Sequence, residues 1–214
     1  MPSPSPGLRE YQSGVAAEKR VALMRAARRV FLRDGYVRAT VAAIATTAGI
    51  SLATLYKHFP AGKAQIFEAV VAEGADTVVP AFERAAAPGA YEGALRGFVI
   101  AYGRVLAAPQ TIEFFRIVIA ETPKQPELGE RWLRSGRAGI AERLRSLLEE
   151  ARALKLLSVA DVATAADELM ASLYHALLWP GLLDPARRAT PSDVERAADR
   201  ALATFYARYG TKSQ

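Results

Sequence analysis

The chain has 214 residues, of which 51% are hydrophobic and 23% charged, so it can bury a core and is not a disordered tail. It has no cysteine and two histidines, which excludes a disulfide framework, a thiol nucleophile and a thiolate zinc site. The first sixty residues hold nine basic and three acidic side chains, whereas the remaining 154 hold nineteen of each. The whole net charge of +6 therefore lies at one end, as expected for a segment that meets a polyanion and is joined to a neutral body.

The sequence predicts no membrane anchor. Residues 1–7 alternate proline and serine and lack the apolar stretch of a signal peptide, and we expect a flexible arm over residues 1–17. The uncharged run 39–56 approaches the length of a spanning helix, but Gly49 and several hydroxyl residues interrupt it. A second uncharged run, 169–183, is too short to span. We therefore expect a soluble, cytoplasmic protein.

Helical periodicity dominates the chain and predicts an all-α fold. A first helix is expected over residues 18–34, with Gly35 as its stop. Thr40 can cap a short second helix that ends at Gly49, and Ser51 can cap a third. Two short helices joined by a glycine turn are typical of a helix-turn-helix, whose capped ends leave backbone N–H groups for phosphate oxygens.

The rest of the chain predicts a larger helical bundle whose joints are marked by prolines. The expected helices cover residues 63–87 (kinked or split at Pro80), 89–107, 110–121, 127–157, 160–179 and 192–209. Three short helices are thus followed by a bundle.

Several short stretches around the glycine turn form one pattern: Gly35-Tyr36, Thr40-Val41, Ile44-Ala45, Ala48-Gly49-Ile50-Ser51, Thr54-Leu55-Tyr56 and His58-Phe59. This pattern resembles the N-terminal signature of the TetR family of transcriptional regulators, and segment 116–128 resembles the AefR-like subgroup of TetR ligand domains. The resemblance implies a homodimer that binds a palindromic DNA operator and is released by a small-molecule effector. The implied domains are the arm over 1–17, a helix-turn-helix domain over 18–62 with its motif at 40–59, and a ligand-binding and dimerisation domain over 63–214.

The resemblance also implies which residues contact DNA. The expected set is Arg20, Thr40, Ser51, Leu52, Ala53, Thr54, Tyr56, Lys57, His58 and Lys63. Thr40, Tyr56 and His58 occupy phosphate-contacting positions, although Tyr56 also fits a core position. Leu52 cannot hydrogen-bond a base edge but can touch a thymine methyl group. Lys63 follows the His-Phe pair one residue later than the family's common spacing.

We expect the effector pocket to be lined by large rings of the bundle. The candidate lining residues are Phe98, Tyr102, Phe114, Phe115, Glu121, Trp132, Tyr174 and His175. Packing in the core is the alternative for each ring, and His175 fits a core or interface histidine equally well. Because the body is net neutral and rich in apolar residues, we expect a mostly apolar effector, with Arg104 or Arg116 available to anchor one carboxylate.

The dimer is expected to form through the last two long helices, which carry two apolar stripes. The first stripe is Leu169, Leu173, Ala176 and Leu177, and the second is Leu202, Phe205, Tyr206 and Tyr209. Two such helices from each subunit would form a four-helix interface.

We interpret the chain as a ligand-responsive repressor that needs no cofactor or metal. The sequence shows no glycine-rich phosphate loop, nucleophile elbow or metal-ligand pair, so we do not expect an enzyme. Two alternatives stay open: an all-α architectural protein that binds DNA without sequence preference, and an enzyme that uses the pocket. A specific regulator should prefer its operator to random DNA by roughly 10³-fold or more.

Overall fold

The computed structural model describes residues 6–76, 91–134 and 138–211, and this part of the chain is helical apart from turns and one isolated bridge between Leu157 and Gly210. The chain divides into two compact units, Met1–Val70 and Val71–Gln214. The boundary lies inside helix α4 (Lys63–Asp76) rather than before it. The first half of α4 therefore belongs to the N-terminal unit, whereas the sequence assigned the whole helix to the C-terminal domain.

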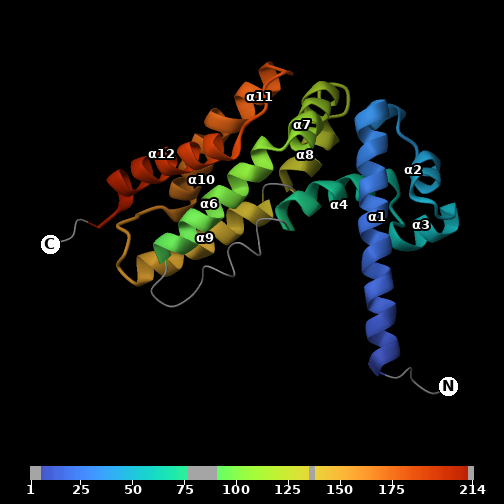
Figure 1. The fold of residues 1–214 in the computed structure, drawn as a ribbon, viewed down its shortest axis with the longest axis horizontal. Helices are drawn as coiled ribbons and strands as arrows, with labels where there is room; N and C mark the ends of the chain where they lie inside the picture. Colours follow the sequence, from blue (N-terminus) through green and yellow to red (C-terminus); the bar gives the residue numbers. More distant parts are fainter. Residues whose placement is uncertain (1–5, 77–90, 135–137, 212–214) are drawn as a thin grey trace. The chain divides into compact units, whose positions relative to one another are not determined.

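The N-terminal unit consists of α1 (Pro6–Arg38), α2 (Val41–Ala48), α3 (Leu52–His58) and the first half of α4 (Figure 1). Helix α1 begins at Pro6 and not near residue 18, so residues 6–17 of the expected arm are helical. Proline is well accepted in the first turn of a helix, and no other proline follows before residue 60. Helical geometry breaks at the expected stop, Gly35, which has a φ of 73°.

Aromatic rings form the centre of the N-terminal core. Phe31 stacks on Tyr36 with ring centroids 5.8 Å apart, and both rings meet Phe67 edge-on, at 5.7 and 5.1 Å. Ile44 of α2 and Leu55 of α3 are fully buried. Because helices of seven or eight residues are marginal alone, this burial, worth roughly 1.5–3 kcal/mol for each large side chain, holds the short helices in place.

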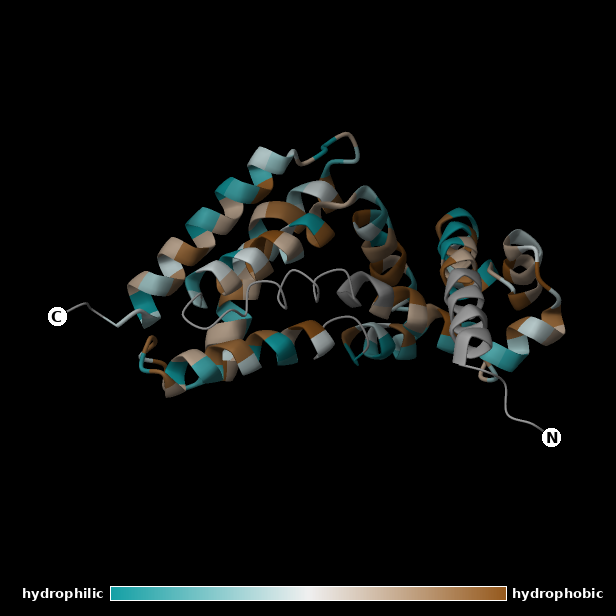
Figure 2. Cartoon of the chain, turned by 60° about the horizontal axis from the view of Figure 1, so that its bottom comes forward, coloured by the Kyte–Doolittle hydropathy of each residue, from teal (hydrophilic) through white to brown (hydrophobic). Residues whose placement is uncertain are grey.

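The C-terminal unit consists of α6 (Tyr91–Ala107), α7 (Pro109–Glu121), α8 (Pro126–Trp132), α9 (Ala138–Ala153), α10 (Val162–Leu173), the π-helical turn η2 (Tyr174–Leu178), α11 (Trp179–Leu183) and α12 (Pro191–Tyr209). Helices α6, α9, α10 and α12 share one continuous apolar core. Hydrophobic and hydrophilic residues alternate along α12, since only one of its faces meets this core (Figure 2). None of the described helices is long and apolar enough to cross a membrane.

The kink or split expected at Pro80 lies outside the described residues. Two expected helices of the C-terminal unit differ from the structure. The single helix expected over 127–157 is described as α8 and α9, with residues 135–137 outside the described part, and α9 ends early where Lys155 takes a left-handed φ of 58°. The helix expected over 160–179 changes into the π-helical turn η2 at Tyr174. Pro180 accounts for this turn, because it has no N–H and its ring would clash with the carbonyl four residues earlier in a regular helix.

Candidate DNA-binding site

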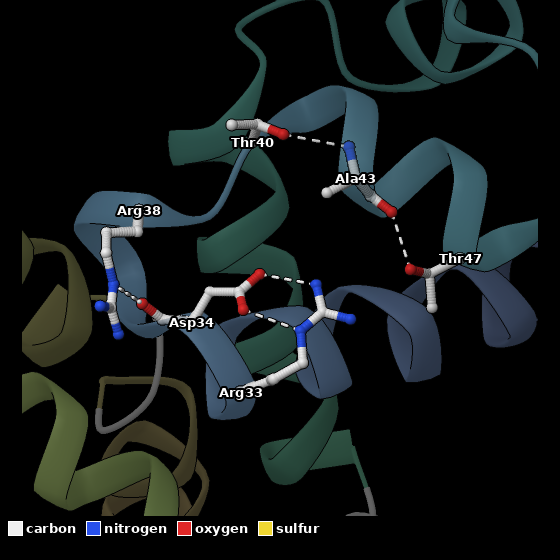
Figure 3. Close-up of polar contacts among 6 residues, drawn as sticks. All are labelled: Arg33, Asp34, Arg38, Thr40, Ala43 and Thr47. Carbon is white, nitrogen blue, oxygen red and sulfur yellow. Dashed lines mark hydrogen bonds and ion pairs between the residues drawn. The ribbon is translucent and has the colours of Figure 1, made fainter.

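Hydroxyl side chains begin both helices of the motif. The Oγ1 of Thr40 accepts a hydrogen bond from the backbone N–H of Ala43 at 3.1 Å (Figure 3). The Oγ of Ser51 accepts one from the N–H of Thr54, also at 3.1 Å. Each cap is worth about 1 kcal/mol. The caps predicted at Thr40 and Ser51 are confirmed.

The turn between the two helices requires glycine for its conformation. Gly49 has a φ of 68° and a ψ of 30°, and its N–H bonds back to the carbonyls of Ala45 and Thr46. Beyond Gly49 and its two chain neighbours, no heavy atom of the described residues lies within 4 Å of the place where a Cβ would stand. Space is therefore not the constraint, and the left-handed backbone alone favours glycine here.

Helix α3 has one buried and one exposed side. Leu55 is fully buried and anchors the helix, whereas Leu52 and Tyr56 are each 45% exposed. The other exposed side chains of this segment are Ser51, Ala53, Lys57 and His58, and Thr54 is half-buried. The structure therefore places Tyr56 at the surface and not in the core, and the expected contact residues of α3 share a free surface.

Arg20 of α1 lies beside this surface. Its guanidinium is 5.8 Å from the centre of the Phe59 ring. A small hollow is lined by Arg20, Thr54 and His58 around an apolar floor of Leu23, Ile50 and Phe59. Three expected DNA-contacting residues from two helices thus gather around one hollow.

Lys63 has a different environment from the other expected contacts. It is half-buried, and its Nζ donates to the carbonyl oxygens of Tyr36 at 2.9 Å and Val37 at 3.1 Å. The ammonium also lies 4.7 Å from the centre of the Tyr36 ring. The structure therefore ties Lys63 to the end of α1, a contact that the sequence did not predict.

One arginine of α1, Arg33, is paired with the neighbouring carboxylate of Asp34. Arg33 makes two hydrogen bonds of 2.7 Å to the Asp34 carboxylate (Figure 3). These hydrogen bonds hold the pKa of Asp34 below its usual value. Because the pair is at the surface, it contributes little to stability, but it leaves Arg33 less able to attract DNA.

Comparison with known families covers both units. Residues 23–70 match the bacterial regulatory proteins of the tetR family, and residues 93–211 match the C-terminal domain of the AefR-like transcriptional repressors. The chain belongs to the TetR family. The N-terminal unit is thus a TetR helix-turn-helix head, and the C-terminal unit is an AefR-like domain. TetR regulators bind DNA and are not enzymes, in agreement with the sequence-based prediction.

Solved structures with the TetR fold resemble most of the chain. One is described as a TetR-family transcriptional regulator from Mesorhizobium loti, with 27% identity, a TM-score of 0.74, and coverage of 91% of this chain and 98% of that one. The flavonoid-responsive regulator FrrA has 27% identity and a TM-score of 0.68, with 92% and 100% covered. A TetR-family regulator from Pseudomonas syringae has 23% identity and a TM-score of 0.67, with 92% and 98% covered. No curated protein matches the chain.

The rings expected to line an effector pocket of the AefR-like domain lie in two groups. Phe98 and Tyr102 of α6 have centroids 6.2 Å apart, and Tyr102 meets Tyr174 of η2 at 6.1 Å. The Tyr102 hydroxyl donates to the Tyr174 hydroxyl at 2.7 Å. In the second group, Phe115 of α7 lies 4.4 Å from Trp132 of α8. Phe98 and Tyr102 are buried, so the first group is also part of the core.

The polar candidates differ in what they offer a ligand. One carboxylate oxygen of Glu121, Oε2, is buried and has no hydrogen-bond partner among the described residues. Arg116 donates to the carbonyls of Gly181 at 2.6 Å and Leu182 at 3.2 Å, so its guanidinium already holds the end of α11. His175 is exposed in the subunit, which contradicts the core alternative for this residue. Phe114, the remaining candidate, is buried.

The two stripes expected to form the dimer interface face the core of their own subunit. The residues buried there are Leu169, Leu173, Leu177, Leu202 and Phe205. The other three pack half-buried against the same core: Ala176, Tyr206 and Tyr209. Burial also raises the pKa of Tyr206 to about 12. Helical spacing of apolar residues identifies a packed face without identifying the partner that packs on it, and within the subunit that partner is the core of the same chain.

The segment formed by η2 and α11 also has an exposed face with two large apolar side chains. His175, Trp179 and Leu183 follow one another at four-residue intervals and are all exposed. Trp179 is 53% exposed and Leu183 is 78% exposed. The sequence contains this four-residue spacing, but the leucine stripe that begins in α10 is more strongly apolar, and the interface was predicted there.

Proposed function

We propose that this TetR-family protein is a repressor that binds a palindromic operator as a homodimer and is released by a small, mostly apolar molecule. The observation that carries the DNA-binding part is the free surface of α3 together with Arg20, in the unit that holds the excess positive charge. Such a surface fits a recognition helix in the major groove, flanked by phosphate contacts. A regulator of this kind works in the cytoplasm, where bacterial DNA lies.

The proposed contacts divide by chemistry. Thr40, Tyr56 and His58 donate to phosphate oxygens, and Arg20 supplies a charge beside them. The exposed Leu52 touches a thymine methyl group. Ser51, Ala53, Thr54 and Lys57 meet base edges or the backbone. Lys63 is left out of this set because its ammonium already has two carbonyl partners.

We expect Tyr56→Phe and Arg20→Met to weaken DNA binding in different ways. Tyr56→Phe removes an uncharged donor, so affinity for a random-sequence duplex should fall about fivefold to tenfold with an unchanged salt dependence. Arg20→Met removes one charge, so the slope of log K against log[KCl] should become shallower by about 0.9. Fluorescence anisotropy with a labelled 30-base-pair duplex measures both.

Lys124→Met is the matched control, because the exposed Lys124 lies in the C-terminal unit. It should leave both affinity and slope unchanged. If Tyr56→Phe and Arg20→Met bind DNA with the same affinity and salt dependence as the unsubstituted protein, α3 and Arg20 are not part of the DNA interface. Selection of genomic operator fragments then distinguishes the repressor from an architectural protein, which would enrich no sequence.

The outward face of η2 and α11 is the proposed dimer interface. Trp179 and Leu183 are large apolar residues exposed in the subunit, and His175 extends the same row. Exposed apolar rows of this kind mark interaction surfaces. The neighbouring helix α12 adds the small exposed residues Ala203 and Ala207, which permit close helix packing. A dimer would hold two recognition helices about 34–36 Å apart, or a multiple of this.

The effector site is proposed at the ring groups of the C-terminal domain. Residues 61–214 carry no net charge, and the Phe115–Trp132 pair offers an apolar surface. The buried Oε2 of Glu121, which has no hydrogen-bond partner in the described part of the chain, favours a ligand with a hydrogen-bond donor. The similar regulator FrrA is named as flavonoid-responsive. A ring compound with hydroxyl donors and little charge therefore fits these residues.

We expect neutral polyphenols, tested as the probe class, to quench tryptophan fluorescence and release operator DNA at matching concentrations. Both tryptophans, Trp132 and Trp179, lie in the C-terminal unit, so the signal reports that unit alone. To move the protein from 1:99 to 99:1 between bound and released states, the ligand must favour one state by about 5.5 kcal/mol.

Trp132→Phe should abolish most of the quenching while Trp179→Phe should not, because only Trp132 belongs to the Phe115–Trp132 pair at which the effector is proposed to bind. Release of DNA by polyanionic compounds alone would contradict the apolar effector.

A further inference from the structure

Lys63 makes a contact that the proposed DNA-binding function does not use. Its ammonium donates to two successive carbonyl groups, of Tyr36 and Val37, at the end of α1. Lysine has three donors and no acceptor, so two of the three are occupied inside the head. A cation at the C-terminal end of a helix is also favoured by the helix dipole.

The neighbouring carbonyl groups already have other partners. The Asp34 carbonyl accepts from Arg38 Nε at 3.0 Å (Figure 3), and the Gly35 carbonyl accepts from the Ala39 N–H at 3.2 Å. With Lys63, each carbonyl group from Asp34 to Val37 has a hydrogen-bond donor at the point where α1 leaves helical geometry. Withdrawing it toward a phosphate would leave the Tyr36 carbonyl without this partner, at a cost.

Aromatic rings also join α1 and α4 next to this hydrogen-bonded contact. The Lys63 ammonium lies over the Tyr36 ring, and this ring meets Phe67, one turn further along α4, at 5.1 Å. A second polar contact joins the two helices further on, where Arg28 donates to the Val70 carbonyl at 3.4 Å. Residues 63–70 of α4 are thus held to α1 at both ends and by a buried ring between them.

We propose that Lys63 is a positioning residue that joins the start of α4 to the end of α1, and not a phosphate contact. Val37 lies three residues before Thr40, the cap of α2, so the contact also fixes the point from which the chain enters the helix-turn-helix. Residues 63–70 of α4 then form one rigid part of the N-terminal unit together with α1 and the start of the helix-turn-helix. The inference uses the proposed function only in taking DNA as the head's ligand.

The test compares Lys63→Met with Lys57→Met, whose lysine is exposed on α3. Binding of the full chain to a random-sequence 30-base-pair duplex is measured over a KCl series, and hydrogen exchange is measured without DNA. Lys63→Met should leave the salt slope unchanged, while exchange over residues 33–41 and 60–70 becomes roughly tenfold faster. Lys57→Met should make the slope shallower by about 0.9 and leave exchange unchanged.

Lys63→Arg retains a cation with several donors and should restore most of the slow exchange. It also keeps the experiment informative if Lys63→Met fails to fold. A shallower slope for Lys63→Met with unchanged exchange would show a phosphate contact and overturn the proposal. Unchanged slope and unchanged exchange would overturn it as well, because the contact would then position nothing. Failure of Lys57→Met to alter the slope would instead count against the proposed DNA-binding surface.

Discussion

We expect Leu183→Asp to convert the protein from a dimer to a monomer at micromolar concentration, while Leu154→Asp leaves it dimeric. Both leucines are largely exposed in the subunit, Leu183 at 78% and Leu154 at 70%. Only Leu183 continues the row of His175 and Trp179 on the proposed interface. A carboxylate buried there without a partner is costly, whereas one placed in water at residue 154 is not.

Sedimentation velocity distinguishes the two variants directly. The loss of the dimer should also weaken operator binding by roughly 10²-fold to 10⁴-fold, because the second head no longer benefits from the first. A dimeric Leu183→Asp would exclude the α11 face from the interface. A monomeric Leu154→Asp would move the interface to the segment between α9 and α10.

The sequence was most informative about the helix-turn-helix because local chemistry determines its shape. The caps at Thr40 and Ser51 and the left-handed Gly49 each depend on one residue and its nearest backbone. The family signature adds the DNA-facing roles, which no single residue type reveals.

Long-range packing explains what the sequence did not show in the C-terminal unit. The leucines of α10, such as Leu169 and Leu173, have the periodicity of an interface helix, but they are buried in the core that α10 shares with α9 and α12. The π-helical turn before Pro180 shifts the face that follows it, and regular helical spacing does not anticipate such a shift. Arg116 was expected to be available for a ligand carboxylate. The carbonyl groups that it binds lie 65 and 66 residues away in the sequence, and no local pattern reveals such partners.

The second large effect is expected at Phe31. This side chain is fully buried and packs against Tyr36 at 5.8 Å and Phe67 at 5.7 Å. Phe31→Ala should destabilise the head by about 3–5 kcal/mol, since it removes a large buried ring and leaves a cavity. A unit of this size has little stability in reserve, so the head should be largely unfolded and DNA binding lost.

The two tryptophans allow this unfolding to be assigned to one unit. Because Trp132 and Trp179 both lie in the C-terminal unit, their fluorescence midpoint in urea should hardly change in Phe31→Ala, while circular dichroism at 222 nm loses signal before any urea is added. Phe98→Ala is the matched control, since Phe98 is equally buried in the core of the C-terminal unit and its loss should lower the tryptophan midpoint. If the tryptophan midpoint falls as far in Phe31→Ala as in Phe98→Ala, the two units unfold together. Damage to the N-terminal core would then also lower the stability of the C-terminal unit.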